Sequence, residues 1–293
     1  MISVCIPVLN NADKISRCLE AVLNQSLKPY EVIVVDGHST DGTVDIAKRY
    51  PVKVLYENYH TRAGALQVGV NNAHGDLIAF TDADCIPDRD WLFNLYTGFN
   101  NGVAGVGGRF EDIGASLWVS SINSTFQTPL SGARSRWDEK KTMKVLSVCG
   151  ANGMVRRRDI YAVGGFNVRL KGAEDLEFAT RLGKLGPFIY TPDAVIYHDH
   201  DRGLWSFIKR AFNYGRHRRQ AELLDAQVAV AILAPVLFLF SGIYMLLALT
   251  IGILTAWQHR RWIFALTVPV AFVAQHTAFI AGYWVQLLTR GNR

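Results

Sequence analysis

Two long segments in the last third of this 293-residue chain contain no charged side chain, and they constrain the fold more than any other feature. Residues 226–257 and 262–289 have no Asp, Glu, Lys or Arg. Because an α-helix needs about 20 apolar residues to cross a bilayer, we expect both segments to form transmembrane helices. Arg260 and Arg261, between the two segments, favour the cytoplasm. The first segment would then form a hairpin that crosses twice, and the second would cross once, which gives three crossings. The alternative is one crossing for each segment.

The excess of positive charge lies next to the first apolar segment. The chain has 31 Lys and Arg against 25 Asp and Glu, and six basic residues with no acidic one occur from Arg202 to Arg219. The stretch 202–225 also carries apolar side chains such as Trp205 and Phe212, which is typical of helices at a membrane surface, so we expect it to contact anionic lipid. The alternative is the last helix of the preceding domain. No nucleic-acid-binding motif accompanies the charge, and we expect no nucleic-acid partner.

Residues 1–201 have the mixed composition of a soluble domain. No basic leader with an apolar core precedes them, so we expect this domain in the cytoplasm, as part of a multi-pass protein of the cell membrane. The cysteines, Cys5, Cys18, Cys85 and Cys149, lack metal-ligand spacing, and we expect reduced, unpaired thiols.

The first eighty residues alternate between short apolar runs and helical patterns. The runs "ISVCIPV", "VIVVD", "VKVLY" and "DLIAF" are typical of buried strands, with a helix between each pair, the third near 63–73. This βαβαβαβ order predicts an α/β domain with a doubly wound, mostly parallel sheet, whose ligands bind at the carboxyl ends of the strands. Asn10, Asp36 and Asp82 each follow a predicted strand, so we expect them to converge on one crevice.

Asp82 and Asp84 stand at i, i+2 directly after the strand "DLIAF". Two carboxylates with this spacing on extended backbone reach the same side, which suits a hard cation such as Mg²⁺ or Mn²⁺. The alternative interpretation is that the two aspartates are only the polar start of a loop. Its place at a strand end of a doubly wound sheet favours the metal site.

Other polar residues allow a structural and a functional interpretation. Asp36 is placed to bind a ribose or a base, or to cap the turn "GHSTDGT". Glu174 and Asp175 begin a predicted helix, where they act either as catalytic acids or as a cap. His198 and His200 either complete a metal shell or are polar residues at a strand end.

Five motifs occur in order along residues 1–200: "ISVCIPVLN", "VIVVDGHSTDGT", "GDLIAFTDADC", "CGANGMVRRRDIYAVGGF" and "GAEDLEFATRL". In sequence and spacing they resemble family 2 glycosyltransferases with the GT-A fold. The resemblance implies that Asp82 and Asp84 bind Mg²⁺ or Mn²⁺ at the donor diphosphate, with His198 as a candidate third ligand. It also implies that Asp175, with Glu174 beside it, is the catalytic base. The implied nucleotide-sugar site comprises Pro7, Asn10, Asp36, Gly64, Asp82, Gly150 and Asn152.

The chain departs from the family pattern at three places. Gly37-His38 follows Asp36 where many relatives carry a second acid, "GALQ" at 64–67 replaces "GARN", and no QxxRW motif follows "YHDHD". The first two changes alter the donor side of the expected site. The third favours a single sugar transfer over polymerisation.

The resemblance and the apolar segments together imply an inverting, metal-dependent transferase. We expect it to move one sugar from a nucleoside-diphosphate sugar to a hydroxyl of a lipid-linked or glycan acceptor at the membrane. The alternatives are a polyprenyl-phosphate sugar synthase, whose acceptor is the lipid phosphate, and a non-catalytic membrane adaptor.

Overall fold

The structure is a computed structural model that describes residues 1–293 except 101, 114–115, 127–140, 146, 149, 200–202, 222–225, 238–240 and 291–293. The chain forms two compact units. The first, the sheet unit, comprises Met1–Ile113 and Arg136–Asp199; the second, the helical unit, comprises Gly114–Ser135 and His200–Arg293. We expected 1–201 to form one domain, whereas Gly114–Ser135 group with the C-terminal helices.

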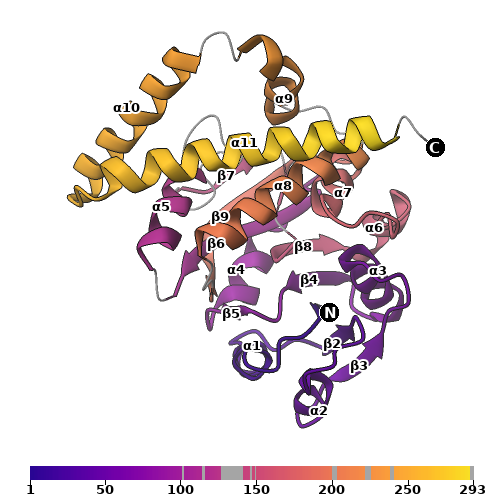
Figure 1. Ribbon diagram of the computed structural model, residues 1–293. Helices are drawn as coiled ribbons and strands as arrows, with labels where there is room; N and C mark the ends of the chain where they lie inside the picture. Colours follow the sequence, from indigo (N-terminus) through magenta and orange to yellow (C-terminus); the bar gives the residue numbers. More distant parts are fainter. Residues whose placement is uncertain are drawn as a thin grey trace. The chain divides into compact units, whose positions relative to one another are not determined.

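Among the described residues, nine strands form one sheet in the sheet unit (Figure 1). They are β1 (Ile2–Val8), β2 (Glu31–Asp36), β3 (Lys53–Tyr56), β4 (Leu77–Thr81), β5 (Cys85–Pro87), β6 (Gly105–Asp112), β7 (Met143–Val145), β8 (Asn152–Arg156) and β9 (Phe188–His198). The order is β3-β2-β1-β4-β8-β6-β9-β5, with β7 on β9. The strands β3, β2, β1 and β4 are parallel, and β8 is antiparallel to both β4 and β6. The predicted mostly parallel α/β fold is therefore confirmed.

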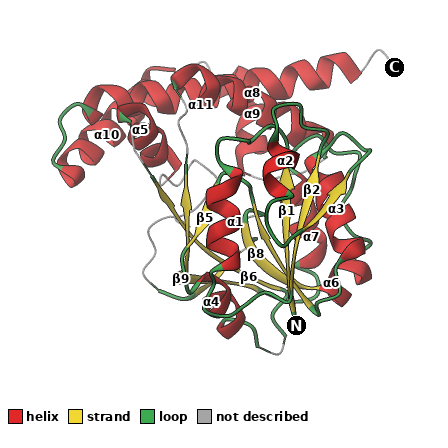
Figure 2. Ribbon diagram, turned by 90° about the horizontal axis from the view of Figure 1, so that it is seen from below, coloured by secondary structure: helices red, strands yellow, loops and turns green. Residues whose placement is uncertain are grey.

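Helices cover both faces of this sheet (Figure 2). They are α1 (Ile15–Leu23), α2 (Thr43–Ala47), α3 (Arg62–Asn72), α4 (Trp91–Thr97), α6 (Arg157–Ala162) and α7 (Glu174–Leu182). Side chains alternate along a strand, so β2 sends Val32 and Val34 to the core shared with α1 and α4. Ile33 and Val35 enter the opposite core, shared with α3, α6 and α7. Runs without alternation in the sequence thus reflect strands buried on both faces.

The parallel strands place their carboxyl ends at one edge. β1 pairs with β2 on one side and β4 on the other, so the winding direction reverses at β1, where doubly wound sheets form a ligand crevice. β1 pairs with β4 only as far as Cys5, so Pro7, which has no N–H to donate, lies beyond the end of that ladder. The loops after β1, β2 and β4 lie at this edge.

Asn152 holds the second half of the sheet together. Its fully buried side chain donates to the carbonyls of Arg109 (2.9 Å) and Ala194 (3.1 Å), and its Oδ1 accepts from Trp91 Nε1 (2.8 Å). The expected contact of Asn152 with the nucleotide sugar remains a prediction. All three hydrogen bonds stay inside the protein, so the residue also has a structural role.

The helical unit contains α5 (Leu117–Phe126), α8 (Leu204–Gln220), α9 (Ala226–Leu237), α10 (Ser241–His259) and α11 (Phe264–Arg290). Helix α11 contacts each of the other four helices. Two described helices are long and apolar enough to cross a membrane, Ser241–His259 with a mean hydropathy of 1.4 and Phe264–Thr289 with 1.6. The second apolar stretch and the later part of the first therefore form long helices, whereas α9 at the start of the first has only 12 residues.

Helices α8 and α11 touch backbone to backbone. A Cβ atom on Gly215 would collide with the carbonyl oxygen of Phe279, and one on Gly282 would collide with that of Phe212. Only glycine allows this approach at both positions. A larger side chain would push the helices apart.

Replacing Asn152 with Ala should lower the free energy of unfolding by about 3–5 kcal/mol, because three buried partners lose their hydrogen bonds at about 1–3 kcal/mol each. Asn94→Ala is the matched control, since its single side-chain bond, to the Asp193 carbonyl, is exposed. Its cost should be at most about 1 kcal/mol. Chemical denaturation monitored by near-UV circular dichroism compares the two, and equal losses would contradict the structural role.

Gly282→Ala should lower the thermal midpoint of the helical unit in detergent, because the new methyl group overlaps the α8 backbone. Gly242→Ala provides the control, since a Cβ atom there meets nothing within 4 Å. Alanine is favoured over glycine in helices by about 1 kcal/mol, so the control should be neutral or stabilising. Equal behaviour of the two variants would argue against close packing of α8 and α11.

Candidate functional site

The loops after β1 and β2 are tied together at the carboxyl edge of the sheet. The backbone N–H of Asn10 donates to Ser39 Oγ (2.8 Å), and Asn10 Oδ1 accepts from the Thr40 N–H (2.9 Å). Asn10 itself has a φ of 52°, which an asparagine tolerates better than most residues. The side of the crevice expected to receive the nucleotide is therefore fixed without a ligand.

Two buried polar atoms at this edge lack a hydrogen-bond partner among the described residues. Asp36, fully buried at the end of β2, accepts from the Ser39 N–H through Oδ2 (2.9 Å), while its Oδ1 has no donor. Thr81 Oγ1 at the end of β4 is likewise unpaired. Buried polar atoms in native proteins are nearly always paired, so both atoms are available to an ordered water or to a bound ligand. Asp36 thus both caps a turn and keeps one free acceptor.

Arg62, at the start of α3, joins the two acidic motifs. Its Nη2 and Nε donate to Asp82 Oδ1 (2.7 and 3.2 Å), and its Nη1 donates to Glu174 Oε1 (2.8 Å). Burial alone would lower the pKa of Arg62, but the charges of Asp82, Glu174 and Asp175 raise it well above its ordinary value. The guanidinium stays charged and holds the three carboxylates near one another.

Glycine at position 150 makes room for this guanidinium. A Cβ atom there would lie 3.1 Å from Arg62 Nη1 and 3.5 Å from the Cβ of Asp175. The expected nucleotide-sugar role of Gly150 remains a prediction. Its position next to Arg62 and Asp175 is consistent with that role.

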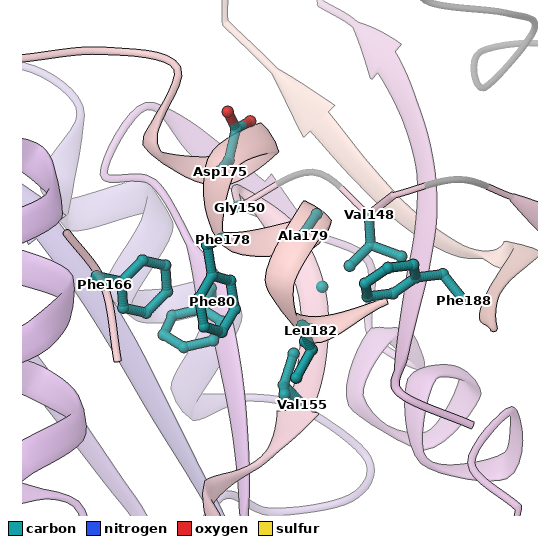
Figure 3. A pocket seen from close by; sticks show the side chains of 11 residues that line it. Phe80, Val148, Gly150, Val155, Phe166, Asp175, Phe178, Ala179, Leu182 and Phe188 are labelled. Atoms are coloured by element: carbon teal, nitrogen blue, oxygen red, sulfur yellow. The ribbon is translucent and has the colours of Figure 1, made fainter. Parts of the chain in front are cut away.

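The motif "GAED" places Glu174 and Asp175 on the first turn of α7. Glu174 is buried against Arg62, whereas Asp175 is half-buried at the rim of an apolar pocket lined by Gly150, Phe178 and others. Figure 3 shows the Asp175 carboxylate pointing away from these apolar side chains. Asp175 Oδ1 also accepts from the Leu176 N–H (2.8 Å). Of the two acids, Asp175 is the more accessible one.

Asp84, in the turn between β4 and β5, meets His198 at the end of β9. His198 Nε2 lies 3.2 Å from Asp84 Oδ1, and one ligand atom each from Asp84, Cys85 and His198 lie within 4.8 Å of one another. Asp82, the third expected ligand, instead directs Oδ1 at Arg62. The set expected from the sequence is therefore assembled in part, with Cys85 added.

The side chains of Asp84 and His198 are suitable ligands for a divalent cation. A carboxylate and an imidazole are ordinary ligands of Mn²⁺, and carboxylates suit Mg²⁺. Burial, together with the charges of Asp82 and Asp84, raises the pKa of the Cys85 thiol well above its ordinary value. Without a metal Cys85 is therefore a neutral thiol, and Mg²⁺ and Mn²⁺ in any case prefer oxygen and imidazole ligands to sulfur. Cys5, Cys18 and Cys85 are free, as predicted, and all three are buried. Cys149 and His200 lie outside the described residues.

Two other positions in the "TRAGALQ" segment have packing roles. A Cβ atom on Gly64 would lie 2.6 Å from the Cβ of Tyr59, so α3 packs closely on the loop after β3. Gln67, where relatives carry the asparagine of "GARN", accepts from the Phe166 N–H (2.7 Å). Arg62 was not predicted as a site residue, although it is the only cation of the "TRAGALQ" segment and lies two residues before Gly64.

The sheet is doubly wound, and acids from the end of β4, the β4–β5 turn and α7 lie at its carboxyl edge. This combination defines a GT-A-type enzyme domain. The family model for glycosyl transferase family 2 matches residues 3–164. A dolichyl N-acetyl-alpha-D-glucosaminyl phosphate 3-beta-D-2,3-diacetamido-2,3-dideoxy-beta-D-glucuronosyltransferase of Methanococcus voltae is 30% identical, covering 73% of this chain and 71% of that protein. The succinoglycan biosynthesis protein ExoA of Rhizobium meliloti is 27% identical over 97% of this chain and 94% of its own length. The chain belongs to glycosyl transferase family 2 and is a glycosyltransferase.

Solved structures agree with this fold. The mannosyltransferase PcManGT from Pyrobaculum calidifontis, in complex with GDP-Man and Mn²⁺, superposes with a TM-score of 0.68 at 21% identity, covering 98% of this chain and 86% of that one. GalNAc-T7 with UDP, GalNAc and Mn²⁺ gives a TM-score of 0.55 at 15% identity over 77% of this chain and 52% of that one. At these identities the likeness concerns the fold alone.

Arg62→Met should lower the free energy of unfolding by about 3–5 kcal/mol, because it leaves the carboxylate of Glu174, whose side chain is 9% exposed, without its counter-charge. The double variant Arg62→Met/Glu174→Gln should recover part of the loss. Arg17→Met, which breaks the more exposed pair with Asp199, is the control and should cost at most about 1 kcal/mol. Denaturation curves that show no difference between Arg62→Met and this control would contradict the bridging role.

Proposed function

We propose that this chain is an inverting glycosyltransferase that moves one sugar from a nucleoside-diphosphate sugar to a hydroxyl of a lipid-linked or glycan acceptor at a membrane. The observation that carries the proposal is the gathering of Asp82, Glu174 and Asp175 around Arg62 at the carboxyl edge of the sheet. That edge is where doubly wound folds bind nucleotides. The family resemblance assigns donor binding to the motif that contains Asp82 and proton removal to the motif that contains Asp175.

The nucleoside half of the donor would lie against the ends of β1 and β2. The free Oδ1 of Asp36 accepts a hydrogen bond and so suits a ribose hydroxyl or a base N–H. Pro7, Asn10, Gly64 and Gly150 would form the walls around the donor.

The diphosphate would lie at the end of β4. Asp84 and His198, together with Asp82, would hold Mg²⁺ or Mn²⁺, which supplies positive charge to the leaving diphosphate. Solved neighbours with the same fold contain Mn²⁺, which supports the use of a divalent cation here.

Asp175 would act as the general base. A sugar hydroxyl has a pKa far above neutrality, so its proton must leave as the oxygen attacks the anomeric carbon. A carboxylate at the rim, unlike the buried Glu174, is placed to accept that proton. Glu174 would position Arg62 and, through it, Asp82. One displacement on the face opposite the diphosphate inverts the anomeric centre and needs no covalent intermediate.

The acceptor would be held at the membrane, with the sheet unit on the cytoplasmic side. The Methanococcus voltae relative acts, by its name, on a dolichyl-phosphate-linked sugar, and two helices of this chain are apolar enough for a bilayer. We therefore place the acceptor among lipid-linked glycans. The sugar and the nucleotide are to be identified by a donor screen with membrane lipid extract and Mn²⁺ or Mg²⁺, read as nucleoside diphosphate release.

Asp175→Asn should lower kcat by about 10²–10⁴-fold, the usual contribution of a general base, while donor binding is kept. Asparagine retains the oxygen that accepts from the Leu176 N–H, so folding should be unaffected. Asp193→Asn, at an exposed position, is the control and should retain full activity. If Asp175→Asn also keeps its activity, the acceptor is the lipid phosphate itself, which needs little deprotonation, and the hydroxyl acceptor is excluded.

EDTA should abolish transfer, and Mn²⁺ or Mg²⁺ should restore it. Asp84→Asn should raise the metal concentration needed for half-maximal activity at least tenfold, because a charged ligand is replaced by a neutral one. Asp45→Asn, in the exposed part of α2, should leave the metal dependence unchanged. A wild type that releases no nucleoside diphosphate with any donor would point to a non-catalytic membrane adaptor instead.

A further inference from the structure

Glu57 is a buried acid that the mechanism above does not use. It follows β3 directly and is 2% exposed, and its Oε2 accepts from the Tyr59 N–H (2.7 Å). Its backbone N–H donates to the Asp36 carbonyl at the end of β2 (3.1 Å). The other carboxylate oxygen, Oε1, has no hydrogen-bond partner among the residues that the structure describes. A buried carboxylate is costly unless its oxygens are paired, so Oε1 is available to a further donor.

The first turn of α3 places Glu57 on the same side of the sheet edge as Asp82. A Cβ atom on Gly64, in this turn, would lie 2.8 Å from Glu57 Oε2. Arg62, two residues earlier, donates to Asp82 Oδ1. The side chains of Glu57 and Asp82 therefore adjoin one turn of one helix, although β2 and β1 lie between the strands that they follow. The N-terminus of this helix also favours a negative charge beside it.

The open oxygen of Glu57 lies beside Gly37, directly after β2. A Cβ atom on Gly37 would be 3.6 Å from Glu57 Oε1 and 3.6 Å from Leu9 Cδ1. Leu9, directly after β1, is 56% exposed. Glycine thus leaves an acceptor oxygen and an apolar side chain close to one point. Asp36 Oδ1, on the preceding residue, is a second buried acceptor that lacks a donor in the described part of the chain.

This combination suits a nucleobase. An aromatic ring with N–H groups needs an apolar surface for the ring and a small number of acceptors for the N–H groups. Gly37, Leu9 and Glu57 offer both at the carboxyl edge of the sheet.

The strand order decides which part of the donor reaches Glu57. The acids proposed to bind the metal at the diphosphate follow β4. Gly37 follows β2, which is two strands away, about 10 Å at the usual strand spacing of about 4.8 Å. The base is the end of a nucleoside diphosphate that lies farthest from the diphosphate. A donor extended along the edge from β4 toward β3 would therefore bring its base to Glu57.

We propose that Glu57 binds the nucleobase of the sugar donor. Its Oε1 accepts a hydrogen bond from an N–H group of the base, while Oε2 stays on the Tyr59 N–H. The inference rests on the nucleotide-sugar donor proposed above and identifies a residue that selects the nucleotide. A carboxylate only accepts, so a base that turned a carbonyl toward Glu57 would bring two acceptors together. Acceptors left unpaired on binding lower the affinity, and Glu57 therefore discriminates between bases.

Isothermal titration calorimetry of the full-length protein in detergent with Mn²⁺ measures the binding of UDP, GDP, CDP and ADP. Glu57→Gln should weaken binding of the nucleotide that the wild type prefers by about 10- to 100-fold, because a hydrogen bond to a charged acceptor is lost. The weakly bound nucleotides should hardly change, so the preference narrows. Glu31→Gln is the matched control. Glu31, at the opposite end of β2, is a partly buried acid that accepts from Ser3, and its replacement should leave all four affinities unchanged.

Gly37→Asp tests the position of the carboxylate. A Cβ atom at residue 37 makes only ordinary contacts, so an aspartate side chain can approach Glu57 Oε1. Beside the wild-type Glu57 its charge should weaken nucleotide binding by repulsion. Combined with Glu57→Gln it should restore part of the lost affinity, which a general loss of folding would not allow. Gly37→Ala, which adds the Cβ atom alone, should bind like the wild type and should not rescue Glu57→Gln.

Three results would overturn the inference: equal affinities of Glu57→Gln and the wild type, an equal loss for all four nucleotides, or a wild type without preference among them. A loss that vanishes with the 2′-deoxy form of the preferred nucleotide would assign Glu57 to the ribose, and would contradict the base contact as well. A wild type that binds none of the four nucleotides would refute the nucleotide-sugar donor too. Binding without sugar transfer would contradict only the proposed reaction.

Discussion

The organisation of the sheet unit depends on one cation placed between three carboxylates. Arg62 comes from the first turn of α3, Asp82 from the end of β4, and Glu174 and Asp175 from the first turn of α7. Acids on separate elements would repel one another at the edge of the sheet, where burial strengthens every charge interaction. Two hydrogen-bonded contacts from a single guanidinium fix the spacing of all three elements. The geometry of the candidate site is therefore set before any substrate binds.

The strands and the acids at their ends could be predicted from the sequence because both signals are local. Unbroken apolar runs such as "VIVV" indicate strands covered on both faces, and the two clusters formed by Val34 and Val35 have that arrangement. Parallel pairing then brings Asp36 and Asp82 to one edge. The residues that link distant elements could not be found in this way. Asn152 lies inside a family motif yet bonds to α4, β6 and β9, partners that only the folded chain brings together.

Hydropathy identified the long apolar helices of the chain but not their arrangement. Residues 241–259 and 264–289 pass the same test of length and composition, although the first is mostly exposed and the second is half buried. What separates them is the neighbour of each helix. Gly215 and Gly282 allow the basic helix α8 to lie directly on α11. The mean hydropathy of α11 contains no information about α8.

The position of α5 in the chain affects how this protein can be divided experimentally. Helix α5 follows β6 and precedes β7, both in the sheet unit, yet it packs with the C-terminal helices through Ile122 and through its bonds to Thr267 and Gln275. A soluble fragment made by stopping the chain near residue 200 would keep α5 and lose α11. The apolar side chains of Trp118, Val119 and Ile122 would then face water and promote aggregation. A well-behaved fragment would therefore also need the stretch around 117–126 shortened or made polar.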